Sequence, residues 1–248
     1  MSTKVIIKNN PQMPYLIEEA LNRLRINISF LGSDIRKIMV ISSEPNEGKS
    51  FLAMHLWQQM ASAGEKAILV DADMRKSIML AKYGIEREDG KEIFGLTHYL
   101  AGDKPLEECI LKTQWEGGDL LANANNVINP SMLLDSQRFG ELLDKLAQDY
   151  RYVFLDTPPL GLVSDGERIG HLCDGAILAV RSGVTPKAVV RSSVAQLERA
   201  GCPLLGIALN RVNASGGRYY HSYYGRYYGK KGYGYGYYGK SGKSGKDK

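Results

Sequence analysis

The sequence is poor in residues that cross-link small proteins or bind metals, since its 248 positions include three cysteines and four histidines. Cys109, Cys173 and Cys202 are odd in number, form no Cys-x-x-Cys pair and lie in or beside apolar segments, which indicates buried, reduced thiols. The histidines are scattered along the chain and predict no metal cluster. These absences exclude a disulfide-rich secreted module and a zinc-centred domain.

Long apolar runs are also lacking. The longest ones, Val153–Leu155, Ala176–Val180 and Leu204–Leu209, are far too short to span a bilayer. The first eight residues, Met-Ser-Thr-Lys-Val-Ile-Ile-Lys, lack the apolar core and cleavage site of a signal peptide. We therefore expect a cytoplasmic protein that is recruited to the inner face of a membrane through a partner.

Charge is distributed unevenly along the chain. Residues 214–248 contain eight basic residues and one acidic residue, a net charge of +7, whereas residues 1–213 contain 24 basic and 26 acidic residues, a net charge of −2. The overall charge of +5 therefore comes from the C-terminal segment.

The segment Ser43–Ser50 has the pattern Ser-x-x-x-x-Gly-Lys-Ser and lies between an apolar strand, 38–41, and a helical stretch, 51–63. Strand, loop and helix in this order are the context of a phosphate-binding P-loop, although Ser43 stands where the usual pattern has glycine. Backbone N–H groups and the helix N-terminus attract phosphate oxygens, Lys49 adds a positive charge, and the Ser50 hydroxyl is suited to Mg²⁺. The predicted nucleotide contacts here are Ser43, Glu47, Gly48, Lys49, Ser50 and Phe51.

Two further apolar strands end in carboxylates. Asp71 and Asp73 follow the strand that begins at Ala67, and Asp156 ends the strand that begins at Tyr152. Ligands of open α/β sheets lie at the carboxyl ends of strands, and alternate residues of a strand face the same side. Carboxylates brought together there need a cation, so this pattern predicts either Mg²⁺ binding or proton abstraction.

The remaining elements alternate between helix and strand. We predict helices over 15–30, 95–101, 105–111, 132–150 and 185–200, strands over 119–122, 174–180 and 204–209, and a loose arm over 1–14. This alternation favours an α/β fold with a doubly wound, mostly parallel sheet. Asn210 and Arg211 follow the last strand and are predicted nucleotide contacts, although a simple turn is an alternative interpretation of Asn210.

Residues 218–238 of the C-terminal segment have an unusual composition, because tyrosine, small and basic residues fill them without any aliphatic side chain. Such a segment cannot bury a core and is expected to be disordered. Its tyrosines suit either phosphorylation or stacking on single-stranded nucleic acid. The ten tyrosines are Tyr219, Tyr220, Tyr223, Tyr224, Tyr227, Tyr228, Tyr233, Tyr235, Tyr237 and Tyr238.

The P-loop, both carboxylate-ending strands and the tyrosine cluster together resemble the bacterial tyrosine kinases (BY-kinases) of capsule and exopolysaccharide biosynthesis, in their separate cytoplasmic form. The resemblance implies a P-loop fold of the partition-ATPase, or deviant Walker, type with ATP and Mg²⁺ as cofactors. It implies that Asp71 is the base for the acceptor tyrosine, that Lys49 binds phosphates, and that Ser50, Asp73 and Asp156 support the metal. Lys76-Ser77 stand where many members have a proline-containing stretch.

The resemblance also implies partners. These are a membrane activator of the chain-length-regulator type, a cognate tyrosine phosphatase, and other copies of the chain in a ring, for which an octamer is one candidate size. Members carry a Glu-x-x-Arg-x-x-Arg motif for assembly on the N-terminal helix; here Glu19 and Arg25 match, while Asn22 replaces the middle arginine. No stable nucleic-acid partner is expected.

We accordingly divide the chain into an arm and oligomerisation helix (1–35), a P-loop kinase domain (36–213) and a basic phosphoacceptor tail (214–248). The predicted function is ATP-dependent autophosphorylation in trans on the tail tyrosines, regulating polysaccharide synthesis and export. One alternative is a partition-type ATPase, although the second lysine typical of that P-loop is absent from Glu44–Glu47. The other is an ATP-switched nucleic-acid-binding module that uses the tail.

Overall fold

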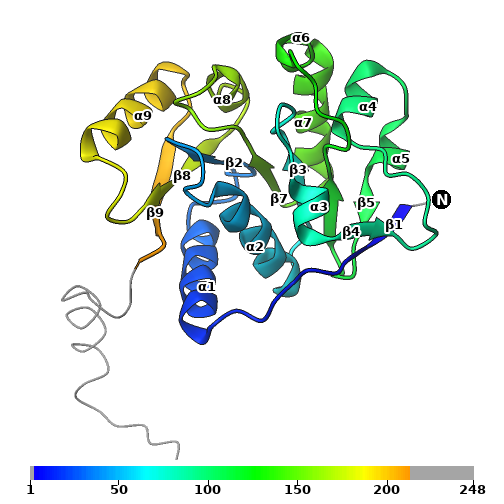
Figure 1. Ribbon diagram of the computed structural model, residues 1–248, viewed down its shortest axis with the longest axis horizontal. Helices are drawn as coiled ribbons and strands as arrows, with labels where there is room; N and C mark the ends of the chain where they lie inside the picture. Colours follow the sequence, from blue (N-terminus) through cyan, green and yellow to red (C-terminus); the bar gives the residue numbers. More distant parts are fainter. Residues whose placement is uncertain (1–2, 213–248) are drawn as a thin grey trace, which may run out of the picture. The chain divides into compact units, whose positions relative to one another are not determined.

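The computed structural model describes residues 3–212, and within this range nine strands form one sheet in the order β4-β1-β5-β6-β3-β7-β2-β8-β9 (Figure 1). The strands are β1 (Thr3–Ile7), β2 (Lys37–Ser42), β3 (Ala67–Asp71), β4 (Ile85–Arg87), β5 (Leu111–Lys112), β6 (Gly118–Leu121), β7 (Tyr152–Asp156), β8 (Gly175–Arg181) and β9 (Leu204–Asn210). The helices are α1 (Tyr15–Ser29), α2 (Lys49–Ser62), α3 (Met79–Tyr83), α4 (Leu96–Ala101), α5 (Leu106–Cys109), α6 (Ser131–Leu134), α7 (Gln137–Asp149), α8 (Asp165–Gly170) and α9 (Lys187–Arg199).

Most of the sheet is parallel. β6, β3, β7, β2, β8 and β9 pair in parallel, and the antiparallel pairs are β1 with β4 and β5 with β6. The expected doubly wound, mostly parallel α/β sheet is therefore confirmed. Its antiparallel pairs lie in the β4–β6 half, and the P-loop lies in the all-parallel half.

The central strands are apolar on both faces because each face is covered by helices. In β2, for example, Met39 and Ile41 pack into the core shared with α4, α5, α7, α8 and α9, while Ile38 and Val40 pack into the core shared with α1, α2 and α3. The same alternation holds in β3, β7 and β8. Continuous apolar runs in the sequence therefore correspond to strands buried on both sides.

The N-terminal segment differs from the expected loose arm. Thr3–Ile7 form β1, whose residues alternate between buried and exposed and which pairs with both β4 and β5. Val5 and Ile7 are buried in the core beside Ile85. The prediction was wrong for these five residues because pairing with strands far along the chain, rather than local propensity, makes this segment a strand.

Two predicted helices are also shorter than expected. The helix expected over 105–111 ends at Cys109, and Leu111–Lys112 form β5 instead. The helix expected over 132–150 is divided into α6 and α7, separated by Asp135 and Ser136. α7 buries one apolar stripe, which is the pattern that predicted it: Phe139, Leu142, Leu143 and Leu146.

Within residues 3–212, no helix has both the length and the apolar character needed to cross a bilayer.

Candidate active site

The P-loop runs from the end of β2 into the first turn of α2. Gly48 precedes the helix with a φ of 97°, in the left-handed region that favours glycine. A Cβ atom added at Gly48 would lie 2.0 Å from Asn210 Nδ2, so the lack of a side chain at Gly48 lets the Asn210 side chain approach the P-loop backbone. The free N–H groups at the start of α2 form a surface suited to phosphate oxygens.

Sheet register brings two carboxylates to the same face as α2. Asp71 ends β3 and Asp156 ends β7, and the two are directly paired in the parallel ladder. In both strands the alternate residues, such as Leu69 and Phe154, pack into the core that includes α2, so the two carboxylates project toward α2 and its P-loop. Asp71 is 1 % exposed and Asp156 is 2 % exposed.

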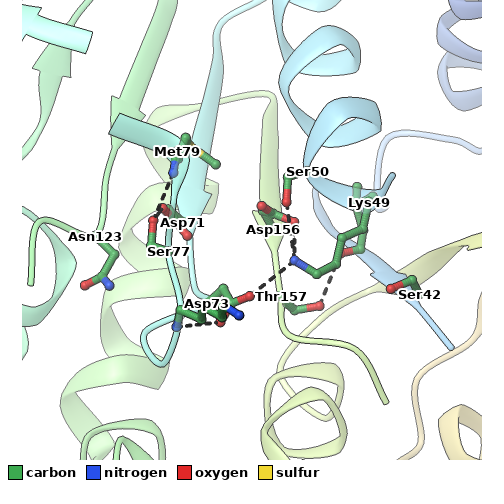
Figure 2. A network of polar contacts seen from close by, with 12 residues as sticks. Ser42, Lys49, Ser50, Asp71, Asp73, Ser77, Met79, Asn123, Asp156 and Thr157 are labelled. Atoms are coloured by element: carbon green, nitrogen blue, oxygen red, sulfur yellow. Dashed lines mark hydrogen bonds and ion pairs between the residues drawn. The ribbon is translucent and has the colours of Figure 1, made fainter. Parts of the chain in front are cut away.

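Lys49 brings the positive charge to this group. Its Nζ lies 3.3 Å from Asp73 Oδ2, 3.5 Å from Asp156 Oδ1 and 3.3 Å from Ser50 Oγ. Figure 2 shows the Lys49 side chain reaching between Asp73 and Asp156. Burial acts to lower the pKa of Lys49, but Asp156 and Asp73 outweigh it and the pKa is raised, so the ammonium stays charged.

Three carboxylates, those of Asp71, Asp73 and Asp156, lie around the Lys49 ammonium. Burial, and next the nearby Asp156, raise the pKa of Asp71 to about 8, although a hydrogen bond from Ser77 opposes the shift. Burial also raises the pKa of Asp156, against the opposing effect of Lys49. A group with an ordinary pKa near 4 that is poised near neutrality is typical of a general base.

The residues present fit a divalent cation bound with a phosphate ligand. Asp156 Oδ1 is buried, and apart from the 3.5 Å ion pair with Lys49 Nζ it accepts no hydrogen bond from the described part of the chain, which leaves room for a further ligand. Ser50 is the second residue of α2, and its hydroxyl, like Asp73 Oδ2, lies 3.3 Å from Lys49 Nζ. Hydroxyl and carboxylate oxygens are the donors that Mg²⁺ prefers, and it usually takes few of them from protein.

These groups line a cavity of about 540 Å³. Its walls come from the P-loop, the loop after β3 and the loop after β7, so three segments distant in sequence enclose one space. Phe51 and Arg211 also line it, whereas the Asn210 side chain donates a hydrogen bond from Nδ2 to the Glu47 carbonyl oxygen (2.9 Å). Asn210 therefore contacts the P-loop backbone directly.

The side chains of Glu47 and Ser43 face protein rather than this cavity. Glu47 is 2 % exposed; its Oε2 accepts from the Glu44 N–H (2.8 Å), and its Oε1 accepts from the Arg181 N–H (3.3 Å) and from the Thr185 hydroxyl. Ser43 Oγ accepts a hydrogen bond from Ser193 Oγ (2.8 Å). Both side chains anchor the P-loop to the β8–α9 region, so only their backbone groups are available to a nucleotide.

The predicted assembly residues lie apart from the cavity, on α1, which packs beside α2. Glu19 accepts a hydrogen bond from Arg23 (3.2 Å), and Arg25 donates to the Asn22 side chain (2.9 and 3.2 Å), the residue that replaces the motif's middle arginine. The ten tail tyrosines, Tyr219 to Tyr238, lie outside the described residues.

Sequence reasoning missed two interactions that shape the loop after β3. Arg75 forms a two-pronged ion pair with Asp165 of α8 (Nε–Oδ2 2.6 Å, Nη2–Oδ1 2.9 Å), which ties this loop to the segment after β7. Ser77 donates a hydrogen bond to Asp71 Oδ2. Arg75 stands at alternate spacing with Asp71 and Asp73, which was the available signal; no sequence signal pointed to Ser77.

Fold and site together define a P-loop nucleotide-binding protein in which two buried carboxylates, Asp71 and Asp156, end adjacent parallel strands. The family model described as an AAA domain matches residues 35–166. Tyrosine-protein kinase CpsD of Streptococcus agalactiae serotype III (strain NEM316) is 35 % identical over 198 residues, which cover 80 % of this chain and 84 % of that protein.

Two solved structures show the same fold. The kinase domain of Escherichia coli tyrosine kinase ETK superposes with a TM-score of 0.74 at 27 % identity, covering 92 % of this chain and 86 % of that one. The septum site-determining protein MinD of Pyrococcus horikoshii OT3, complexed with Mg-ADP, gives a TM-score of 0.60 at 25 % identity, covering 73 % and 72 %. The chain belongs to the bacterial tyrosine-protein kinase family, whose fold is shared with MinD-type ATPases, and this membership implies nucleotide binding.

Proposed function

We propose that this kinase transfers the γ-phosphate of ATP to tyrosines 219–238 of a second copy of the chain. The bond from γ-phosphorus to the β–γ bridging oxygen breaks, a bond from γ-phosphorus to the tyrosine oxygen forms, ADP leaves, and the phenolic proton passes to Asp71. The transfer is proposed to control the synthesis and export of a capsular or secreted polysaccharide.

The observation that carries the proposal is the pairing of Asp71 with Asp156 across β3 and β7, on the face that meets the P-loop. Two buried carboxylates beside Lys49 provide both a proton acceptor and a metal-supporting oxygen in one cavity. A base close to neutrality suits a tyrosine hydroxyl, whose ordinary pKa is about 10. A tail with ten tyrosines supplies acceptors in the same chain.

Each residue has a proposed part in the transfer. Backbone N–H groups of Gly48 and the first turn of α2 bind the phosphates, and Lys49 neutralises charge that develops on the transferring group. Phe51, Asn210 and Arg211 are proposed to contact the rest of the nucleotide, together with backbone groups near Ser43 and Glu47. Ser50, Asp73 and Asp156 would hold Mg²⁺, which when bound supplies charge neutralisation at the phosphate oxygens.

Phosphorylation would reverse the charge of the tail. A phosphotyrosine carries about −1.5 to −2, so ten of them take the tail from +7 to roughly −8 to −13. Mutual repulsion of such tails is proposed to dissolve a ring of subunits assembled through α1, with Glu19 and Arg25 in the contact. The assembly is proposed to act at the inner face of the membrane, with a membrane activator of the chain-length-regulator type and a cognate tyrosine phosphatase.

The test is incubation of the full chain with Mg²⁺ and ATP, read by intact mass and phosphosite mapping, with and without the activator's cytoplasmic segment. We expect phosphate on tyrosines 219–238 in the wild type and only a small residual rate of transfer in Asp71→Asn. ATP hydrolysis with an unmodified tail, even with activator present, would overturn the proposal in favour of a partition-type ATPase.

A further inference from the structure

Ser77 lies in the same cavity as the P-loop lysine and the proposed base. Its hydroxyl donates a hydrogen bond to Asp71 Oδ2, and no described residue donates a hydrogen bond to the other carboxylate oxygen, Oδ1. Figure 2 shows Ser77 beside Asp71, on the side away from Lys49. The two oxygens of Asp71 are therefore in different situations, one held by the protein and one left open.

Hydrogen bonds to its hydroxyl oxygen, its N–H and its carbonyl oxygen hold Ser77 in place. The Met79 N–H donates to Ser77 Oγ (3.3 Å), which leaves the single hydroxyl proton to point at Asp71. The Ser77 N–H donates to Asn126 Oδ1 (2.9 Å), and Asn126 Nδ2 lies 3.5 Å from the Ser77 carbonyl oxygen. The hydroxyl therefore has a defined direction instead of rotating freely.

The support extends back to the sheet. Asn123, two residues after β6 and 3 % exposed, donates from Nδ2 to Asn126 Oδ1 (3.2 Å). A chain of hydrogen bonds thus runs from Asn123 through Asn126 and Ser77 to Asp71, and it begins in a loop next to the strand that pairs with β3. Residues whose orientation is locked by a supporting shell are those that can place a reacting group within a fraction of an ångström.

We propose that Ser77 is a positioning residue for phosphotransfer, holding Asp71 by Oδ2 so that Oδ1 is the oxygen that takes the proton of the acceptor tyrosine. The inference rests on the proposed function, in which Asp71 is the base. It assigns a task to a position for which the sequence alone gave none. In this role Ser77 acts through Asp71 and not on the nucleotide or the acceptor itself.

A purely local role for Ser77 is the competing explanation, because accepting the Met79 N–H is a common serine turn at the start of a helix. The chain offers a matched control at Thr113. Its Oγ1 accepts the Trp115 N–H (3.3 Å) in the same two-residue turn, but donates to the Gly118 carbonyl oxygen (2.6 Å) rather than to a carboxylate. Thr113→Ala therefore removes an equivalent turn far from the cavity.

The experiment measures phosphate transfer from each full-length enzyme to a mass-tagged Lys49→Met copy, which serves only as acceptor, together with Mg-ATP affinity by calorimetry. We expect Ser77→Ala to lower kcat by about tenfold, because a small misplacement of a reacting group is costly, while Mg-ATP affinity changes less than about twofold. Ser77→Thr keeps the hydroxyl and restores the rate. Thr113→Ala keeps the wild-type kcat.

A double-mutant cycle tests whether Ser77 acts through Asp71. Adding Ser77→Ala to Asp71→Asn is expected to leave the residual rate unchanged, since the group being positioned is gone. A wild-type kcat in Ser77→Ala, a raised kcat/KM for the acceptor, or a rate loss matched by weaker Mg-ATP binding would each overturn the inference. If Asp71→Asn retains full activity, the proposed function fails; if it is inactive while Ser77→Ala is normal, the positioning role alone fails.

Discussion

The two ends of the central strands treat buried carboxylates in opposite ways. Near the start of β6, Asp119 is 5 % exposed and accepts hydrogen bonds from the Lys112 ammonium and the Tyr150 hydroxyl. At the carboxyl ends of β3 and β7, Asp71 and Asp156 are at least as deeply buried, yet Asp156 Oδ1 accepts no hydrogen bond from any described residue and lies 3.5 Å from its ion-pair partner, Lys49 Nζ. Removing a partner from a fully paired buried charge destabilises the fold, whereas an incompletely paired one is a candidate site for a ligand.

The largest expected effect comes from exchanging the lysine at each end. Lys49→Met should lower phosphotransfer by about a thousandfold, because charge developing on the transferring phosphate loses its closest cation. Lys112→Met removes a lysine–aspartate pair at the other end and should leave the rate unchanged. Intact mass after incubation with Mg²⁺ and ATP measures both, and equal losses in the two variants would remove the distinction between the ends.

Effects on stability should be opposite at the two ends: a substitution beside Asp119 should destabilise the fold, and one at Asp71 should stabilise it. Tyr150→Phe leaves Asp119 without one of its two donors and is expected to cost about 1–2 kcal/mol in the free energy of unfolding with kcat unchanged. Asp71→Asn is expected to raise the stability of the nucleotide-free protein at neutral pH, because the buried Asp71 carboxyl takes up a proton on folding there and Asn does not. Urea denaturation followed by circular dichroism measures both changes. A stabilising Tyr150→Phe would contradict the comparison.

A further effect on stability is a pH dependence at the catalytic end. Asp71 has a folded pKa of about 8, above its unfolded value near 3.8, so the folded state retains a proton that the unfolded state has lost. The stability that this carboxyl contributes is complete below about pH 4 and is lost as the pH rises to about 8. Thermal denaturation without nucleotide should show the wild type losing stability relative to Asp71→Asn over this range, at about 2–4 °C per kcal/mol. If the melting temperatures of the wild type and Asp71→Asn changed in parallel with pH, the pKa of Asp71 would be an ordinary one.

The sequence predicts the central sheet well because β2, β3, β7 and β8 are buried on both faces and each reads as an apolar run. It predicts the peripheral strands poorly. β1, β4 and β5 have two to five residues each, and their pairing with distant segments decides their conformation. Val5 and Ile7 did carry an alternating pattern that a search for period two would have found.

The site, too, has features that the sequence predicts and features that it does not. The proximity of Asp71 and Asp156 to the P-loop follows from a general property of parallel sheets, and the structure places them there. The contacts of Ser77 with Asn126, and of Glu47 with Thr185, join loops 49 and 138 positions apart in the sequence. Such contacts depend on how those loops fold against the sheet, which no local pattern encodes.

The register between β3 and β7 also limits how the length of the chain can vary. Asp71 is paired with Asp156, and Asp156 with Val40 of the neighbouring β2. Inserting or deleting one residue within any of these strands would turn the following side chains to the opposite face, moving a carboxylate away from the P-loop while preserving an apolar composition. Natural gains and losses of single residues are therefore expected in the loops between elements, and a working descendant of this protein should keep the spacing within these three strands.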